Sequence, residues 1–293
     1  MTSSPASSDS FGALRLSSAS LSNLEQLGYT RMTPIQAASL PLTLAGHDLI
    51  AQASTGSGKT AAFGLPLVER LTGAGSPGAA VQAVVLCPTR ELADQVTQEI
   101  RRLARSRPNV KVVTLCGGVA LRGQVQSLEH GADVVVGTPG RILDHLERGS
   151  LSLAGVNTLV LDEADRMLDM GFFDDIAKVV RQCAKDRQTL LFSATYPEGI
   201  DKLASQFMRA PQTVKVEALH SAHKIRQVFV EVSETERLHA VSMLLAHFRP
   251  ERTLAFCNTK QQCRDLVEVL QAQGYVALAL YGELEQRERD QVL

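Results

Sequence analysis

The sequence has few of the features that a membrane, secreted or metal-binding protein needs. None of its apolar runs approaches the length of about 18 residues that crosses a bilayer. Residues 1–10 are mostly Ser, Thr, Ala and Pro, without the basic and apolar regions of a signal peptide, and they predict a disordered lead. We therefore expect neither a membrane partner nor a cleaved leader.

The cysteines form no Cys-x-x-Cys pair, and none clusters with histidine at metal-ligand spacing, which argues against a zinc site. Each lies on an apolar stretch, so we expect reduced core side chains and a cytoplasmic location. The five are Cys87, Cys116, Cys183, Cys257 and Cys263.

The sequence also lacks an excess of charge of either sign, because its 30 Lys and Arg nearly balance its 31 Asp and Glu and leave a net charge of −1. No overall basic field draws the protein to nucleic acid, so any such contact must be local. The densest basic cluster, at residues 101–111, favours a solvated face over a binding groove. With 293 residues, 44% of them hydrophobic, the chain has room for one large or two ordinary α/β domains.

Residues 53–60 (Ala-Ser-Thr-Gly-Ser-Gly-Lys-Thr) follow a short apolar segment and precede a stretch with helical periodicity. This is the context of a phosphate-binding loop. Gly56 and Gly58 would let successive N–H groups face phosphate oxygens. Lys59 would reach the terminal phosphates, and the Thr60 hydroxyl would contribute to a Mg²⁺ site. The alternative is a glycine turn with an exposed lysine, since Gly-Lys-Ser/Thr arises by chance in roughly one chain in seven of this length.

A second motif, Asp-Glu-Ala-Asp at residues 162–165, follows an apolar run that ends in its first acid. A parallel strand would deliver this acid to the carboxyl edge of a sheet. Asp162 would hold Mg²⁺ through water, opposite Thr60, and Glu163 would polarise the attacking water. A solvated acidic turn is the alternative, but this tetrapeptide has a chance expectation of about one in two hundred here. Together the two motifs predict an ATPase.

Strand-like and helix-like segments alternate along most of the chain, which predicts an α/β fold with parallel strands and helices on both faces. We expect strands at 48–53, 81–86, 111–115, 133–137, 158–162 and 189–192, an edge strand at 213–216, and helices at 34–44, 61–70, 91–105, 121–130 and 141–146. The active crevice should lie at the carboxyl ends of the strands.

Short turns rich in Gly, Pro, Thr and Arg recur at the expected strand exits. They occupy residues 88–90, 117–118, 138–141 and 193–195. Such residues suit contacts to phosphate and 2′-hydroxyl groups, although each turn alone is also ordinary turn chemistry.

A polar stretch at residues 217–224 has the composition of a linker and divides a domain over 11–216 from a second unit over 225–293. In the second unit we expect strands at 227–232, 253–258 and 276–280, helices at 236–247 and 261–273, and a charged helix after residue 281. Because this unit has only about half the usual size of an α/β domain, we expect an incomplete domain.

Taken jointly, these motifs resemble those of the DEAD-box family of ATP-dependent RNA helicases. Residues 28–36 (Gly-Tyr-Thr-Arg-Met-Thr-Pro-Ile-Gln) resemble the adenine-reading Q motif of that family. Residues 53–60 resemble its phosphate loop, in which alanine at the first position is usual. Residues 162–165 and 193–195 resemble its hydrolysis and coupling motifs. The fold that this resemblance implies is two RecA-like parallel-sheet domains.

The second unit carries the resemblance further. Residues 256–259 (Phe-Cys-Asn-Thr) resemble the first motif of the family's second RecA-like domain. Residues 256–260 and 282–293 are most similar to the bacterial DbpA subgroup, which acts on large-subunit ribosomal RNA.

The resemblance implies ATP and Mg²⁺ as cofactors and assigns a role to each motif residue. The nucleotide would be bound by Phe11, Tyr29, Gln36, Ser54, Thr55, Gly56, Ser57, Gly58, Lys59 and Thr60. Catalysis would use Lys59, Asp162, Glu163, Ser193 and Thr195, with the metal at Thr60 and Asp162. The RNA backbone would cross Pro88, Thr89, Arg90, Gly117, Gly118, Thr138, Pro139, Gly140 and Arg141. From its place near the start of a helix, we expect Gln36 to face outward.

The implied function is RNA remodelling by a monomer, in which ATP hydrolysis is coupled to local separation of an RNA duplex during ribosome assembly. Two alternatives are an ATP-gated RNA clamp that does not unwind and a DNA helicase with the same core. The family's later motifs, including its arginine finger, do not occur in these 293 residues. We therefore expect this chain to bind ATP, to hydrolyse it slowly and to separate duplexes poorly, with residues beyond about 225 less stable than the first domain.

Overall fold

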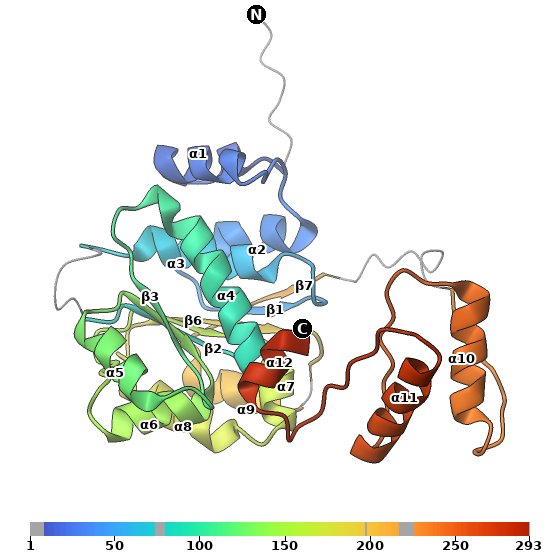
Figure 1. Cartoon of the computed structure of the whole chain (residues 1–293). Coiled ribbons are helices and arrows are strands. Elements are labelled where there is room, and N and C mark those ends of the chain that lie inside the picture. Colours follow the sequence, from blue (N-terminus) through green and yellow to red (C-terminus); the bar gives the residue numbers. More distant parts are fainter. Residues whose placement is uncertain (1–8, 74–79, 197, 217–225, 293) are drawn as a thin grey trace, which may run out of the picture. The chain divides into compact units, whose positions relative to one another are not determined.

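Seven short strands form one parallel sheet, in the order β3-β4-β2-β5-β6-β1-β7 (Figure 1). The structure is a computed structural model that describes residues 9–73, 80–196, 198–216 and 226–292. The strands are β1 (Leu49–Gln52), β2 (Ala83–Leu86), β3 (Val112–Leu115), β4 (Val134–Gly137), β5 (Thr158–Leu161), β6 (Gln188–Ser193) and β7 (Gln212–Lys215). Each adjoining pair is parallel, so all seven exits lie at one edge of the sheet.

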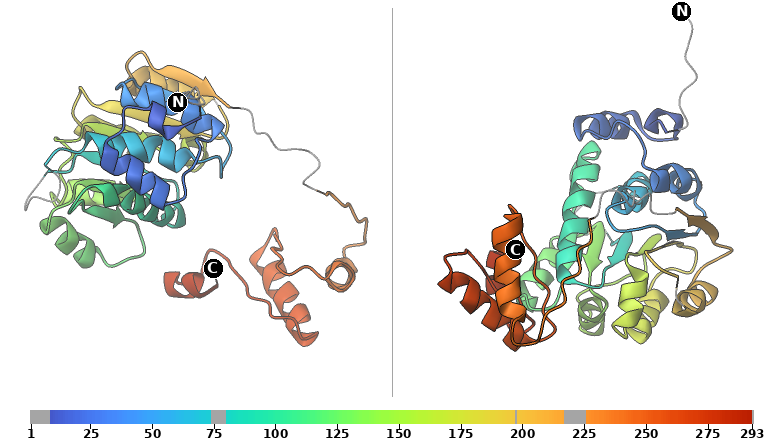
Figure 2. Two further views of the ribbon diagram at one scale, coloured as in Figure 1. Left: turned by 90° about the horizontal axis from the view of Figure 1, so that it is seen from above. Right: turned by 90° about the vertical axis from the view of Figure 1, so that its right-hand side faces the viewer.

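Helices cover both faces of this sheet (Figure 1, Figure 2). They are α1 (Ser18–Gln26), α2 (Pro34–Leu44), α3 (Lys59–Arg70), α4 (Arg90–Leu103), α5 (Leu121–Glu129), α6 (Pro139–Glu147), α7 (Ala164–Asp169), α8 (Phe173–Gln182) and α9 (Glu198–Phe207), with 3₁₀ turns at Phe11–Ala13 and Ala104–Ser106. The predicted α/β sheet is confirmed.

Two apolar cores, one on each face, explain why the strand sequences are almost continuously hydrophobic. Val85 of β2 packs in the core that contains Phe63 of α3. The neighbouring Val84 packs in the other core, with Ile142 of α6. Because successive strand residues point to opposite faces, a strand covered on both sides needs apolar residues at every position. The edge strand β7, by contrast, is largely exposed.

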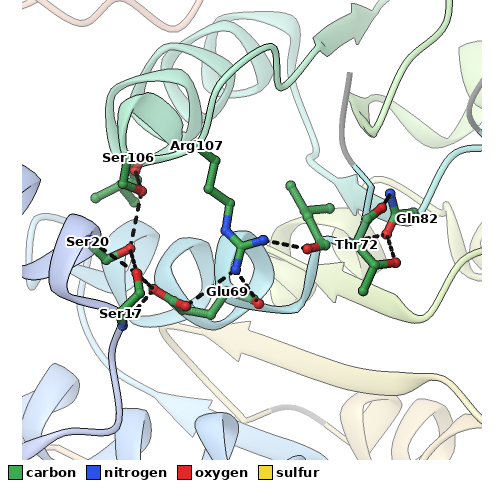
Figure 3. A network of polar contacts seen from close by, with 9 residues as sticks. Ser17, Ser20, Glu69, Thr72, Gln82, Ser106 and Arg107 are labelled. Carbon is green, nitrogen blue, oxygen red and sulfur yellow. Dashed lines mark hydrogen bonds and ion pairs between the residues drawn. The ribbon is translucent and has the colours of Figure 1, made fainter. Parts of the chain in front are cut away.

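Polar contacts tie the segment that precedes α2 to the ends of α3 and α4 (Figure 3). The Ser17 hydroxyl donates to Glu69 Oε1 at 3.0 Å, and the Ser20 hydroxyl donates to Ser106 Oγ at 3.1 Å. Arg107 donates through Nη2 to the carbonyl oxygen of Glu69 at 2.8 Å. Arg107 therefore faces inward rather than belonging to a wholly solvated basic face, because α3 presents unsatisfied carbonyl groups at its C-terminal end.

The chain divides into two units, Met1–Leu219 and His220–Leu293. In the second unit, α10 (Arg237–Phe248), α11 (Lys260–Ala272) and α12 (Gln286–Val292) lie close to the predicted helices. The strands predicted at 227–232, 253–258 and 276–280 are wrong, because residues 226–292 contain no strand in the structure. Apolar periodicity predicts an extended backbone, but a strand also needs a partner for its N–H and C=O groups.

Three of the five cysteines lie in the core, as predicted, and two do not. All five cysteines are free; Cys87, Cys116 and Cys183 are buried, whereas Cys257 and Cys263 are partly exposed. No helix in the described part of the chain has the length and hydrophobicity that crossing a membrane requires.

Candidate functional site

The sheet order places the predicted site residues in two adjoining groups along one edge. The exits of β5, β6 and β1 are neighbours and carry the acid pair, the 193–195 turn and the glycine loop. The exits of β3, β4 and β2 are also neighbours and carry the turns at 117–118, 138–141 and 88–90. The residues predicted to bind nucleotide and the turns predicted to contact a nucleic-acid backbone thus occupy adjoining halves of the edge, which meet where β2 pairs with β5.

The loop between β1 and α3 has the left-handed backbone that glycine permits. Gly56 and Gly58 have φ values of 77° and 93°, and Gly58 is the N-cap of α3. The Ser57 hydroxyl donates to the Ser54 carbonyl at 2.7 Å and holds the turn. Because the first N–H groups of a helix have no partner within the helix, the start of α3 at this loop would stabilise an anion.

Gln36 does not face outward as predicted: it is only 1% exposed. Its Oε1 accepts the N–H of Thr33 at 3.0 Å, and its Nε2 donates to the Gly58 carbonyl at 3.1 Å. A Cβ on Gly58 would lie 2.5 Å from that Nε2. The glycine loop therefore packs directly on Gln36 at Gly58, which explains why this polar side chain is buried at the first turn of α2.

Phe11 and Tyr29 meet edge to face, with ring centroids 6.1 Å apart and an interplanar angle of 89°. Phe11 is buried, so it supports Tyr29 instead of presenting its own face to a ligand. The Tyr29 hydroxyl donates to Glu99 of α4. Burial, followed by this carboxylate, raises the pKa of Tyr29, so the ring stays neutral.

Lys59 and Asp162 are buried charges at the mouth of the loop. Lys59 Nζ has no hydrogen-bond partner among the described residues. Burial raises the pKa of Asp162 to about 6 against the opposing effect of the Lys59 charge, and the nearby Glu163 charge adds to the rise. An unpaired buried ammonium group is unfavourable, so the site fits an anionic ligand such as a phosphate.

Glu163 begins α7 in a left-handed conformation, with φ of 51°. Such a backbone is uncommon for a residue with a side chain. Its Oε1 accepts a hydrogen bond from the Thr55 hydroxyl at 3.5 Å. The carboxylate is thereby held at the glycine loop, one residue away from Asp162.

The 193–195 turn is held by Asp165, a residue that sequence reasoning did not select. Thr195 donates to Asp165 Oδ2 through both its N–H and its hydroxyl, each at 2.8 Å, and the Asp165 N–H donates to Ser193 Oγ at 3.3 Å. Burial alone would raise the pKa of Asp165, but the hydrogen bonds from Thr195, Ser193 and Arg166 outweigh it and lower that pKa. The fourth residue of the Asp-Glu-Ala-Asp motif thus joins the β5 and β6 exits.

In the other half of the edge, the Arg90 guanidinium lies against Gly118. A Cβ on Gly118, where φ is 71°, would come within 1.9 Å of Arg90 Nη2. Arg90 Nη1 is buried without a hydrogen-bond partner in the described part of the chain. Only glycine allows this approach, so two of the predicted backbone-contacting turns are brought together.

The turn at 138–141 joins the same group through Arg141, whose Nη1 donates to the Val119 carbonyl at 3.1 Å and to Gln124 Oε1 at 3.0 Å. The N–H of Thr138 donates to the Leu115 carbonyl at 3.1 Å. Pro139 begins α6 and is buried. The remaining predicted residues lie on the same turns. Pro88 is buried, and Thr89 is the N-cap of α4. Gly117 directly precedes Gly118, and Gly140 lies between Pro139 and Arg141.

A parallel sheet whose first strand enters a glycine loop, with acids on the neighbouring exits, is the arrangement typical of α/β proteins that bind nucleotide phosphates. The sequence model of the DEAD/DEAH box helicase family matches residues 33–203. The chain belongs to the DEAD/DEAH box helicase family.

Two curated relatives are named RNA helicases. The chain is 50% identical over 275 residues to the ATP-dependent RNA helicase DbpA of Escherichia coli (strain K12), a match that covers 94% of this chain and 60% of DbpA. It is 43% identical over 284 residues to the DEAD-box ATP-dependent RNA helicase CshA of Geobacillus kaustophilus, covering 97% of this chain and 60% of CshA. The chain thus spans less than two thirds of the length of these relatives.

Solved structures show the same fold. A DEAD box protein from the hyperthermophile Methanococcus jannaschii matches with a TM-score of 0.67 at 40% identity, over 97% of this chain and 76% of that one. A Saccharomyces cerevisiae Dbp5 variant, whose structure holds Gle1 and IP6, matches with a TM-score of 0.75 at 29% identity, over 97% of this chain and 71% of that one.

Proposed function

We propose that this chain binds ATP and RNA along the carboxyl edge of its sheet and supplies the ATP-hydrolysing part of an ATP-dependent RNA helicase. The observation that carries the proposal is the buried Lys59 ammonium group, which has no acceptor among the described residues and lies at the left-handed glycine loop with Asp162 nearby. An anion would complete this site, and membership of the helicase family supports the phosphates of ATP as that anion.

Bound ATP and Mg²⁺ would supply the phosphoryl group and the charge that polarises it. Lys59 would hold the terminal phosphates, while the loop N–H groups line the others. Thr60 and Asp162 would hold the metal, Asp162 through water. Glu163 would orient the attacking water and accept its proton, and its contact with Thr55 keeps the carboxylate at the loop.

On the base side, the ring of Tyr29 would stack on adenine, with Phe11 holding that ring from behind. Gln36 would read the adenine edge while it also supports the Gly58 carbonyl, since a side-chain amide nitrogen has two hydrogens to donate. Base selection and loop geometry would then depend on the same side chain.

RNA would cross Arg90, Gly118 and Arg141, whose charges and close backbone approach suit phosphate and sugar rather than bases. These three residues form the proposed RNA track. The contacts of Asp165 with Ser193 and Thr195 would couple the RNA track to the residues that hydrolyse ATP. Following the resemblance to DbpA, we place the protein in the cytoplasm as a monomer that acts on ribosomal RNA.

The test is single-turnover hydrolysis of ATP with excess protein and single-stranded RNA. Glu163→Gln should keep ATP binding and slow hydrolysis by about 10² to 10⁴, because the amide cannot accept the proton. Glu147→Gln, at the exposed end of α6, is the matched control. Hydrolysis by Glu163→Gln at the parental rate would contradict the assigned role.

Two further measurements separate the proposal from its rivals. ATP-dependent RNA binding is common to a helicase and an ATP-gated clamp, so the discriminating measurement is strand separation, which a helicase carries out with ATP, even if slowly, and a clamp does not carry out at all. Competition between RNA and DNA single strands distinguishes an RNA enzyme from a DNA helicase. We expect RNA to compete better, through contacts to its 2′-hydroxyl groups.

A further inference from the structure

Gln124 is the one buried residue of α5, a helix whose other side chains are partly or fully exposed. Its amide joins α5 to two other segments, the turn after β3 and the helix α6. Nε2 donates to the Cys116 carbonyl at 2.9 Å, while Oε1 lies 3.0 Å from both Arg141 Nη1 and His145 Nε2. A buried amide with partners for both of its ends adopts a single orientation.

The Cys116 carbonyl, which can only accept, and the Arg141 guanidinium, which can only donate, fix that orientation, and the fully buried His145 of α6 contacts the same oxygen. Gln124 Oε1 has no hydrogen to donate, so His145 must carry a proton on Nε2. Its Nδ1 lies 2.8 Å from Ser150 Oγ, and this contact holds the ring. Burial, with the neighbouring Arg141 charge, lowers the pKa of His145, which favours the neutral ring.

The consequence is a turn that is held at both ends. Cys116 comes directly before Gly117 and Gly118, and its carbonyl is held by Gln124. The residue directly after them is Val119, whose carbonyl is held by Arg141. Gln124 thus fixes one end of the turn itself and the other through the arginine.

We propose that Gln124, which His145 also contacts, is a positioning residue that holds Arg141 and the 117–118 turn at the spacing that an RNA backbone requires. The inference rests on the proposed RNA-binding function. A flexible arginine must be ordered when it binds a phosphate, whereas one already held on Nη1 loses less conformational entropy. Gln124 acts before the RNA arrives and need not touch it.

RNA affinity is the first measurement, by fluorescence anisotropy of a labelled single strand. Gln124→Met keeps the volume but removes the amide, and it should weaken RNA binding about tenfold. ATP affinity should stay within about twofold, because the nucleotide half of the edge is not altered. The matched control is Gln126→Met, on the exposed face of the same helix, which should bind RNA as the parent does.

A double-variant cycle separates positioning from general stability. If Gln124 acts partly through Arg141, Gln124→Met should cost less RNA affinity in an Arg141→Ala background than in the parent, because only its contact with the Cys116 carbonyl is then left to lose. Additive losses would overturn the positioning role. If Arg141→Ala alone leaves RNA binding unchanged, the proposed RNA track fails instead, so the two failures are distinguishable.

A measurement on the unaltered protein keeps the inference testable if Gln124→Met does not fold. In NMR spectra of arginine side chains, rotation of the Arg141 guanidinium should be slow in the absence of RNA. The comparison is with Arg122, which is exposed on α5. Equally fast rotation of the two groups would overturn the proposal. His145→Gln, which keeps an N–H near Nε2, should retain slow rotation better than His145→Leu.

Discussion

The carboxylate of Asp165 receives hydrogen bonds from two segments of the chain. Thr195 donates twice to Oδ2, and the N–H of Arg166 donates to Oδ1 at 3.0 Å. Hydrogen bonds to an ionised group are stronger than those between neutral groups. The contact between the exits of β5 and β6 therefore depends on the negative charge of one residue, Asp165.

Asp165→Asn should lower the free energy of unfolding by about 1 to 3 kcal/mol at pH 7, because the amide loses the charge-assisted bonds. The pKa of Asp165 is lowered in the folded state, so the stabilisation is present above the unfolded pKa of about 3.9 and is lost as pH falls through the folded pKa. Urea unfolding should show the difference at pH 7 and a smaller difference at a pH below the unfolded pKa of about 3.9, shrinking as pH falls through the folded pKa. Asp169→Asn, exposed at the end of α7, is the control; an equal deficit for Asp165→Asn at both pH values would contradict the charge argument.

The contact between Gly58 and Gln36 can also be tested at the residue scale. Gly58→Ala adds a Cβ that lies 2.5 Å from Gln36 Nε2, at a backbone φ of 93° that alanine adopts only under strain. ATP affinity, measured by calorimetry, should fall, and Gln36→Ala should lower it by less in the Gly58→Ala protein than in the parent, because the shorter side chain also relieves the clash. Gly56→Ala, also left-handed but with open space around its Cβ, separates strain from the clash. An equal loss from Gln36→Ala in the parent and in Gly58→Ala would mean that the clash is unimportant.

Among the helices and strands, the sequence predicted those whose formation follows from the residues of the segment itself. Thr33 and Pro34 predicted the start of α2, because a good N-cap and a proline at the first helical position need no distant partner. The apolar runs predicted β2, β4, β5 and β6, since strands buried on both faces need apolar residues throughout. The edge strand predicted at residues 213–216 corresponds to β7, which lies at the edge of the sheet.

The features that the sequence did not predict depend on contacts between residues that lie far apart along the chain. Gln36 is buried because Gly58, 22 residues later, packs on it. Asp165 and Gln124 look like surface residues in sequence, yet Thr195 and Arg141 come to them from other strand exits. The three strands predicted in the second unit failed for the same reason, since pairing is not a local property. In the first unit, β1 pairs with β6 and β7, both from the far end of that unit.

The docking of α1 offers a test at this scale. Glu69 accepts from the Ser17 hydroxyl at 3.0 Å and is paired with Arg107 (Figure 3). Glu69→Ala should speed amide hydrogen exchange across α1 while exchange in the sheet stays slow, because α1 loses an anchor but the core is intact. Glu129→Ala, exposed at the end of α5, should change neither. Uniformly faster exchange in Glu69→Ala would show that α1 is not a separate cooperative segment.

Over the whole molecule, the two units differ in how much apolar surface they bury. Phe229, Phe256 and Val276 in the second unit are 91%, 95% and 98% exposed, whereas the first unit has two extensive cores. A unit that buries little apolar surface gains little stability. We expect limited proteolysis to cut within 226–292 well before it cuts within the sheet of the first unit. Simultaneous digestion of both units would contradict this expectation.

The most direct test of the nucleotide site is a calorimetric titration of ATP with Mg²⁺ into the chain and into Lys59→Ala. The parent should bind, and Lys59→Ala should lose at least about tenfold in affinity, because a charged hydrogen-bond donor to phosphate is removed. Its stability without ATP should not fall, since the substitution removes a buried charge that has no partner in the described residues. Lys178→Ala, exposed on α8, should bind like the parent. Equal ATP affinity for the parent and Lys59→Ala would contradict the account.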